Sequence, residues 1–458
     1  MSQAAHILEQ STTKAFFKYV SLNILSMTAL SLYFLADTFF VANGVGEKGL
    51  VALNLVIPAY NLLNGLGLLL GIGGATRFAI AMGENRPDKY SQIFTRVVLA
   101  AAALGAFFLI TALCLGREIA VLLGAEGEII PLVETYYKTF MCFAVFYLLQ
   151  NILTAFVRSD MNPRLAMTAM ITASFANIVL DYLFIYPLQM GMFGASLATS
   201  IGAMLSISVL SLHFVKKKNS FHFTRLVRKV GETKNILFSG LPSFITECST
   251  GVVVLVFNMV ILGLAGPKGV GAYGIITNVA LVCIAIFNGI GQGVGPLIGV
   301  HFGAGNRRQI QKIFVLAAAL ALLLGAVFYL CGLLFAPEIV SAFNRENDAK
   351  LSAIAVNGIH LYFISFLPLG FNIVTVALFA CVARPKESFL ISALRGFLLL
   401  IPAVLILPGF LGLPGVWSSA PVSEFSAALA ALICSLRYFK GRKKQSLTND
   451  TQRFAELP

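Results

Sequence analysis

This chain of 458 residues repeats itself after about 220 residues, and both copies are almost wholly apolar. The segment with Asn151 and Thr154 returns as Asn372 and Thr375. Other pairs in the same order are Gly49 and Gly269, Ala52 and Ala272, Gly71 and Gly291, Gly73 and Gly293, Gly83 and Gly303, Pro187 and Pro408, Gly191 and Gly412, and Gly194 and Gly415. A shared order and offset over most of the chain indicates two copies of one structural unit. Internally repeated bundles of membrane helices are typical of transporters, in which one half moves against the other.

The composition places both copies in a membrane. The chain is 58% hydrophobic and only 12% charged, whereas a soluble protein carries about 25% charged residues. Runs of about 20 apolar residues can cross a bilayer as a helix, and no strand-like alternation of a barrel is present. The predicted fold is an all-α integral membrane protein with about 12 transmembrane helices in two pseudo-symmetric six-helix lobes. The expected spans are 16–42, 50–82, 94–116, 133–157, 165–188, 192–215, 236–264, 270–302, 313–336, 355–382, 388–410 and 414–438.

These spans define the expected domain organisation. A segment 1–15 precedes an N-lobe at 16–215, a linker at 216–235 connects it to a C-lobe at 236–438, and a tail occupies 439–458. Six spans return the chain to its starting side, so the two lobes should be parallel repeats related by an axis along the membrane normal. The basic linker is expected to lie along anionic headgroups rather than to bind RNA, and the tail from Lys440 is expected to be solvated and disordered.

The distribution of basic residues predicts the topology. With a cytoplasmic N-terminus, all but six of the 33 Lys and Arg residues fall on the cytoplasmic side. The six exceptions are Lys48, Arg117, Lys138, Lys268, Arg345 and Lys350. This positive-inside pattern predicts a multi-pass protein of the plasma membrane, the inner membrane in a bacterium, with both termini in the cytoplasm. The net charge of +13 therefore reflects topology, and no nucleic-acid partner is expected.

Acidic residues within the apolar spans are the main candidates for function. Of the twenty acids, only Asp37, Asp181, Glu247 and Glu424 fall inside the predicted spans. An ionisable side chain in a bilayer costs at least about 2.5 kcal/mol, so it is expected to face the interior and to be functional. No Lys or Arg is predicted deep enough in a span to pair with these acids, although Arg395 is placed near an interface. Polar neighbours, a bound cation or a proton should then stabilise the carboxyl groups.

Oxygen-bearing side chains gather around two of these acids in the first half only. Asn177 and Asp181 are four residues apart and share one helix face, as do Tyr33 and Asp37. Further candidates are Thr199 in the sixth span and Asn151 and Thr154 in the fourth. Such a set suits a hard monovalent cation, although small polar side chains can also simply bridge helices.

Two spans are rich in glycine at matching places. The first contains Gly71 and Gly73, and the second contains Gly291 and Gly293 followed by Pro296. Neither has the spacing of a nucleotide-binding loop. Glycine at these positions favours close helix packing, and with proline it also allows a hinge. Both interpretations remain open from the sequence. The seven cysteines lie within or at the ends of spans without metal-ligand spacing, so they are expected to be core residues.

At this point the chain resembles the multidrug and toxin extrusion (MATE) family of secondary transporters over its whole ordered length. The motifs that carry the resemblance are Ala36-Asp37-Thr38, Asn177-x-x-x-Asp181, Arg158 after the fourth span, Gly240-Leu241-Pro242, and Leu413-Pro414-Gly415-Val416-Trp417. The resemblance implies two lobes in a V and export of organic cations in exchange for Na⁺ or H⁺. It also implies a cation site at Asp37, Asn177, Asp181 and Thr199, with Tyr33, Tyr136, Asn151 and Thr154 as its neighbours.

The second half departs from one branch of that family. That branch has functional acids in the seventh and tenth spans, whereas this chain has Glu247 about one turn from the family position and no acid in the tenth span. Glu247 and Glu424 are therefore tentative residues of a substrate cavity, and a structural role is open for each. The substrates implied are hydrophobic cationic drugs or dyes, which aromatic side chains can bind through cation–π contacts.

Other classes of protein remain as alternatives. A lipid-linked saccharide flippase of the same superfamily should have a cationic cavity for a pyrophosphate, and an ion channel should have a selectivity filter. No arrangement of a nucleophile and a base is present, so no enzyme activity is expected. We expect a monomer in contact with membrane lipids, with no cofactor apart from the coupling ion.

Overall fold

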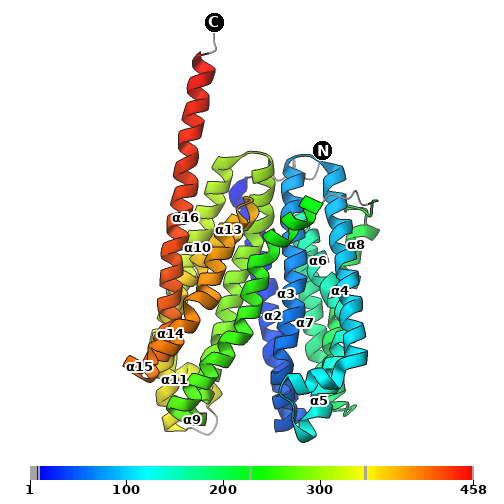
Figure 1. Ribbon diagram of the computed structural model, residues 1–458, viewed down its shortest axis with the longest axis vertical. Helices are drawn as coiled ribbons and strands as arrows, with labels where there is room; N and C mark the ends of the chain where they lie inside the picture. Colours follow the sequence, from blue (N-terminus) through cyan, green and yellow to red (C-terminus); the bar gives the residue numbers. More distant parts are fainter. Residues whose placement is uncertain (1–7, 9–10, 226–229, 345–347, 456–458) are drawn as a thin grey trace.

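In the computed structural model the chain forms two helical bundles that lie side by side (Figure 1). The structure describes residues 8, 11–225, 230–344 and 348–455, with side chains as far as residue 440. These ranges contain helices and short connections but no strand, as predicted. The bundles meet at the end where α2 begins and where α16 leaves the bundle, and they separate at the opposite end (Figure 1).

The first bundle, the N-lobe, contains six spans. Its helices are α2 (Thr12–Gly44), α3 (Glu47–Gly83), α4 (Pro87–Leu122), α5 (Ile130–Cys142), α6 (Ala144–Ser159), α7 (Pro163–Ile185) and α8 (Gly191–Val215). The short helices α5 and α6 form one span that bends by 51° at Phe143. Proline occupies the first turn of α4, α5 and α7, where its missing N–H leaves no hydrogen bond unmade.

The second bundle, the C-lobe, follows the same order. Its elements are α9 (Val230–Gly303), α10 (Arg307–Phe343), α11 (Ala349–Tyr362), the 3₁₀ turn η2 (Phe363–Ser365), α12 (Phe366–Cys381), α13 (Pro385–Ala393), the π-helical turn η3 (Leu394–Leu398), α14 (Leu400–Ile406), α15 (Pro408–Leu411) and α16 (Leu413–Ala455). The turn η2 interrupts the tenth span at the place that corresponds to the bend at Phe143 in the fourth span.

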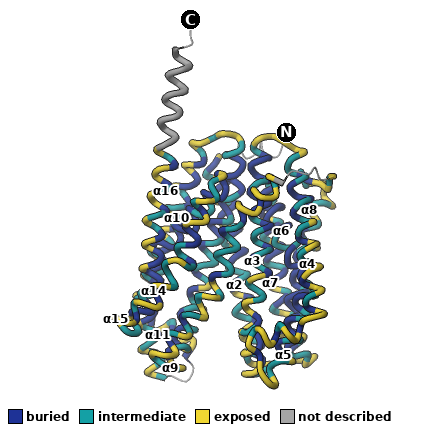
Figure 2. Tube along the Cα trace, viewed as in Figure 1, coloured by how far each residue is buried: buried dark blue, intermediate teal, exposed yellow. Residues whose placement is uncertain are grey.

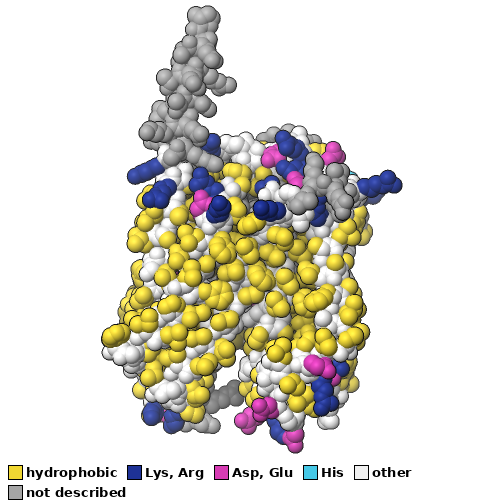
Figure 3. All heavy atoms as spheres, viewed as in Figure 1, with side chains coloured by type: hydrophobic (Ala, Val, Ile, Leu, Met, Phe, Trp, Pro, Cys, Tyr) yellow, Lys and Arg dark blue, Asp and Glu magenta, His cyan; other side chains and the backbone are white. Residues whose placement is uncertain are grey.

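Each of the twelve predicted spans has a helical counterpart in the described ranges. Ten helices are long and apolar enough to cross a membrane, and the bent pair of α5 and α6 supplies another span. Helix α9 supplies two, because its 74 residues would be far too long for one crossing. The chain turns back at Gly266, whose φ of 65° and ψ of −162° suit glycine. An apolar band covers the face of the molecule seen in Figure 3, and charged side chains gather at the two ends of that face.

Helix α16 extends to Ala455 and projects beyond the bundle (Figure 1). The segment that follows Gly441 contains no proline before the end of this helix, so nothing in its sequence forces the helix to end. The expectation that the tail from Lys440 is solvated and disordered stays a prediction.

Glycines allow the helices of the two lobes to pack closely against each other. Helix α9 packs against both α2 and α3 of the N-lobe. A Cβ atom on Gly83 would lie 2.9 Å from the Cα atom of Gly303, and one on Gly73 would lie 3.0 Å from the backbone N of Gly240. A Cβ atom on Gly293 would similarly lie 2.9 Å from the Cα atom of Val20. The matched glycines therefore allow close packing, the first of the two interpretations, and they do so between the lobes.

The distribution of buried residues agrees with two lobes that meet at one end. Buried residues line the inner helices of each lobe and the closed end between the lobes, whereas the outward faces are exposed or intermediate (Figure 2). A hollow separates the lobes at the opposite end in the space-filling view (Figure 3). The fold thus provides two separate interiors, one inside the N-lobe and one between the lobes.

Candidate functional site

Two acidic side chains meet inside the N-lobe. Asp37 lies on α2 and Asp181 on α7, and these helices pack against each other. The exposed fraction is 7% for Asp37 and zero for Asp181. Their carboxyl groups lie within electrostatic range of each other, and neither is paired with a Lys or Arg in the described part of the chain. Two buried carboxylates this close repel each other unless a proton or a cation neutralises one of them.

An amide and a hydroxyl complete this cluster. With the Asn177 amide oriented to satisfy its neighbours, Nδ2 donates to Oδ2 of Asp181 at 3.0 Å and Oδ1 accepts from the Thr199 hydroxyl at 3.2 Å. Oδ1 of Asp37 and Oδ1 of Asp181 are buried without a hydrogen-bond partner. The cluster of Asp37, Asn177, Asp181 and Thr199 therefore offers free oxygen atoms in a site closed to solvent.

Tyrosines surround the two acids. Tyr33 and Tyr136 are buried and lie within electrostatic range of Asp37, so the structure brings both predicted neighbours to the cluster. The Tyr33 hydroxyl is 3.5 Å from that of Tyr60. Tyr147, which the sequence analysis did not single out, is also buried and lies within electrostatic range of both acids.

The other two predicted neighbours behave differently. Asn151 donates from Nδ2 to Oδ1 of Asn64 and to the backbone carbonyl of Tyr147, both at 3.2 Å. Asn64 in turn donates to Oε1 of Glu247 on α9 at 2.9 Å. Asn151 thus joins a chain of hydrogen bonds that leads to the other lobe. The Thr154 hydroxyl is buried and makes no hydrogen bond.

The donor set fits a monovalent cation or a proton. It comprises two carboxyl groups, one amide oxygen and one hydroxyl, all oxygen ligands of the kind that hard cations prefer. No group of three or more His, Cys, Asp or Glu residues that could hold a metal ion occurs in the described ranges. The two free carboxyl oxygen atoms could accept either a proton or a coordinated Na⁺.

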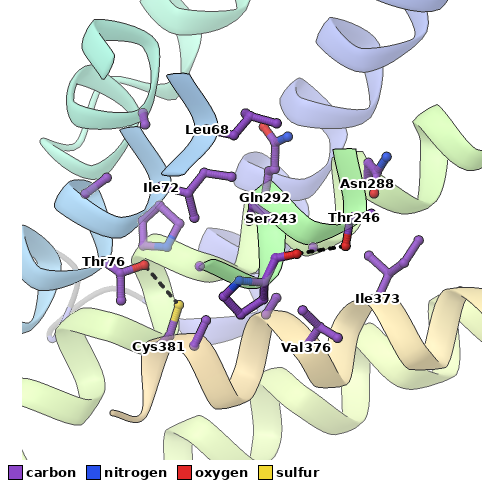
Figure 4. Close-up of a pocket in the computed structure, with 18 of the residues that line it drawn as sticks. Leu68, Ile72, Thr76, Ser243, Thr246, Asn288, Gln292, Ile373, Val376 and Cys381 are labelled. Carbon is purple, nitrogen blue, oxygen red and sulfur yellow. Dashed lines mark hydrogen bonds between the residues drawn. The ribbon is translucent and has the colours of Figure 1, made fainter. Parts of the chain in front are cut away.

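A cavity of about 150 Å³ lies between the lobes, near their closed end. Figure 4 shows Leu68 and Ile72 of α3 on one side and Ile373 and Val376 of α12 on the other, with Gln292 of α9 between them. The other lining residues are Ala75, Thr76, Ala155, Arg158, Ser159, Pro242, Ser243, Thr246, Glu247, Asn288, Gly291, Gly295, Pro296, Ala377, Ala380, Cys381 and Arg395. Residues of both repeats form this wall, as a site at a repeat interface requires.

Charged residues of both signs line this cavity. Glu247 is on its wall, whereas Glu424 is not. Arg158 at the end of α6 is only 5% exposed and donates from Nη1 to Oε1 of Gln292 at 2.6 Å. This bond joins the two lobes at the cavity. The contact of Thr76 with Cys381 at 3.8 Å, which Figure 4 marks with a dashed line, also joins them.

The prediction that the intramembrane acids have no basic partner was wrong for Glu424. Arg395 donates to Oε1 of Glu424 from Nε at 3.1 Å and from Nη2 at 2.9 Å. Asn372 donates to Oε2 of the same carboxylate at 2.7 Å. Arg395 lies in the π-helical turn η3, which changes the direction of the side chains in this span. A regular helical periodicity could not reveal that inward direction.

The fold and this site define a class of protein, an integral membrane transporter built from two repeats around a central cavity. The family model described as MatE matches the chain twice, over residues 23–183 and 242–406. The chain belongs to this family, the multidrug and toxin extrusion transporters, and is a multi-pass membrane protein.

Curated relatives match along almost the whole chain. The multidrug export protein MepA of Staphylococcus saprophyticus is 26% identical over 410 residues, which are 88% of each chain. MepA of Staphylococcus aureus strain MSSA476 is 25% identical over 434 residues, 93% of this chain and 94% of that protein. A crystal structure of MATE in complex with MaL6 matches with a TM-score of 0.91 at 23% identity, over 97% of this chain and all of the other. These comparisons support the fold and the family.

Proposed function

We propose that this protein exports hydrophobic amphiphilic drugs that carry a positive charge, in exchange for Na⁺ or H⁺. The observation that carries the proposal is the buried pair of Asp37 and Asp181, which lacks a basic partner in the described ranges. A carboxyl pair in this state needs a cation or a proton for stability, which suits an ion-coupling site. The MepA relatives, named as multidrug export proteins, support the substrate class.

The packing of α2 suggests how the ion site acts on the cavity. Asp37 is on α2, which packs against α7 inside its own lobe and against α9 of the other lobe. Binding or loss of the ion changes the contact of α2 with α7, and α2 transmits that change to the lobe interface. Coupling requires only that ion and drug bind the two conformations of the lobes with different affinities.

We place the closed end of the cleft in the cytoplasm. Basic side chains gather at this end, where α16 leaves the bundle (Figure 3), as the positive-inside rule requires. The structure is then the state open to the outside, and a matching solved structure is titled as the outward-facing conformation of a multidrug resistance MATE family transporter (TM-score 0.90, 23% identity, 96% of this chain and 98% of that chain). In this state Glu247 on the cavity wall attracts the cationic group of the drug.

Lipid-linked saccharide flipping is the second candidate function. Arg158 and Arg395 on the cavity wall favour it, because a pyrophosphate needs cationic partners. Glu424 already neutralises Arg395, however, and Glu247 adds a negative charge to the same wall. The wall then keeps one free positive group, Arg158, and one free negative group, Glu247, which suits an amphiphile with a positive group better than a pyrophosphate with several negative charges.

The proposal can be tested with the purified protein in proteoliposomes. A fluorescent cationic dye is loaded, a Na⁺ gradient or a pH gradient is imposed separately, and dye movement is followed. Movement driven by at least one gradient, and absent from liposomes that contain Asp181→Asn, supports the proposal. Equal dye movement with and without both gradients would reject coupled export.

A further inference from the structure

Arg158 is a buried cation on the cavity wall without a counter-charge. Its exposed fraction is 5%, and its Nε atom has no hydrogen-bond partner. Nη1 donates to the neutral Gln292, and Nη2 lies 3.9 Å from the sulfur of Met170, a weak acceptor. No carboxylate pairs with this guanidinium in the described part of the chain. Part of its capacity to donate hydrogen bonds is therefore unused, and the residue lines the cavity.

The other charged residues near the cavity do not supply this counter-charge. Arg395, the second guanidinium on the wall, is neutralised by Glu424 at 2.9 Å. Asp160, two residues beyond Arg158, instead accepts hydrogen bonds from His213 at 2.8 Å and from the backbone N of Ser220 at 2.7 Å. The carbonyl end of α6 favours a cation at Arg158, but a helix dipole is weaker than an anion. A buried charge without a partner is unstable, so an anion that enters the cavity gains a strong interaction.

We propose that Arg158 forms an anion subsite of the central cavity, which binds a singly charged carboxylate-like group of an amphiphile. This inference rests on the proposed function, since it assumes that the exported molecule occupies this cavity. Glu247 on the opposite lobe is bonded to the neutral Asn64 and has no basic partner in the described ranges. The N-lobe thus presents a positive group and the C-lobe a negative group to one space. A zwitterionic amphiphile satisfies both and connects the lobes.

The geometry agrees with a small, planar anionic group. Guanidinium groups bind carboxylates and phosphates through parallel hydrogen bonds, and the guanidinium of Arg158, whose Nε has no partner, belongs to a residue that lines the cavity. A volume of about 150 Å³ accommodates such a group with one aromatic ring. The rest of the molecule would extend into the hollow between the lobes (Figure 3). Either the carboxylate of an exported drug or the phosphate of an anionic lipid has the required chemistry.

Rhodamine B and its ethyl ester form a matched pair of probes, because esterification removes the carboxylate and leaves the cationic ring system unchanged. Binding of each dye to the purified protein in nanodiscs of neutral lipid is measured by fluorescence polarisation without any gradient. Arg158→Gln should weaken binding of rhodamine B about tenfold or more, the range for loss of a charged hydrogen bond. It should leave the affinity for the ester within about twofold. Arg158→Lys should retain part of the preference for rhodamine B.

Arg164→Gln is the matched control, since Arg164 is exposed in the first turn of the next helix, α7, and it should change neither affinity. Equal weakening of both dyes by Arg158→Gln would show a purely structural role and overturn the proposal, as would no change for either dye. Nanodiscs with phosphatidylglycerol identify the source of the anion. Competition of this lipid with rhodamine B in the wild type but not in Arg158→Gln assigns the subsite to the headgroup, and no competition assigns it to the substrate. If the dyes bind as expected but no gradient moves them, the proposed function fails while the subsite stands.

Discussion

At the scale of single residues, the N-lobe cluster combines features that sequence alone could reveal with others that it could not. Asp37 and Asp181 were identifiable because a carboxyl group in an apolar span is costly and rare. Asn177 followed from its spacing on the same helix. Tyr147 was not identifiable, because a buried tyrosine in a helix has the same sequence signal as any core aromatic residue. Arg395 was misplaced because its inward direction depends on a π-helical turn.

We predict that Asp37→Asn and Asp181→Asn each abolish coupled export while the protein still folds and inserts. Neutralisation removes the charge that couples to the ion and also removes the cost of burying a carboxylate. The thermal midpoint of the purified variants should be equal to or above that of the wild type. Drug resistance of cells with normal amounts of either variant should fall to that of cells without the transporter. Wild-type resistance would show that the pair is not the coupling site.

A substitution at Thr199 can distinguish Na⁺ from H⁺ as the ion that occupies the site. Its hydroxyl would be an additional Na⁺ ligand that proton binding does not need, so we expect Thr199→Val to weaken the Na⁺ dependence of transport more than its pH dependence. Since both ions would occupy the same carboxyl oxygen atoms, Na⁺ affinity should also fall as the pH is lowered. Thermal stability measured in a grid of Na⁺ concentration and pH tests this. Complete insensitivity to Na⁺ at every pH would identify a site for protons alone.

At the scale of elements, the matched glycines determine how closely the lobes approach. Sequence identified the repeated glycines but left packing and hinge bending as alternatives, because both need a residue without a side chain. The structure places Gly83 of α3 against Gly303 of α9, at the closed end. The bends at Phe143 and at η2 recur in both repeats. No glycine or proline stands near Phe143, so the sequence could not predict that bend, whereas Pro368 has no N–H to donate to the carbonyl of Ile364 and marks the break at η2.

We predict that Gly303→Val opens the cytoplasmic end and reduces export severely, because a branched side chain cannot fit against the backbone of Gly83. Its Cβ atom alone would lie 2.9 Å from the Gly83 Cα atom. Proteolysis of cytoplasmic loops, or labelling of cysteines introduced near the interface, should report the opening. Gly263→Val is the control, because nothing lies within 4 Å of a Cβ atom at that position. Equal effects of both substitutions would contradict a role for the close contact.

At the scale of the whole molecule, the repeat and the fold class followed from the sequence with few errors. The chain has twelve apolar runs in two sets that repeat after about 220 residues, and most Lys and Arg residues fall on one side. Few arrangements of the chain across a membrane satisfy both conditions, and the helices of both lobes agree with the expected order. The contacts between the two lobes could not be predicted from the sequence. Contacts such as that of Asn64 with Glu247 join residues of different repeats, and no local pattern predicts which distant polar side chains meet.

A covalent link across the lobes should stop transport if they move against each other. Thr76 and Cys381 lie on opposite lobes with Oγ1 and Sγ 3.8 Å apart. We expect Thr76→Cys to form a disulfide with Cys381 under mild oxidation, which would hold the cytoplasmic end closed and block export until a reductant is added. The same substitution combined with Cys381→Ala should be insensitive to oxidant. Full export by the linked protein would contradict a mechanism in which this interface opens.

The central claim is that export of a drug is exchanged for an ion at the Asp37 and Asp181 pair. The most direct measurement is the ion flux that a drug gradient drives in proteoliposomes, followed with radioactive Na⁺ and an internal pH dye in parallel. We predict that a cationic dye drives Na⁺ or H⁺ in the opposite direction through the wild type, and that Asp181→Asn gives no ion flux although it still binds the dye. Drug-driven ion flux of wild-type size through Asp181→Asn would contradict the account.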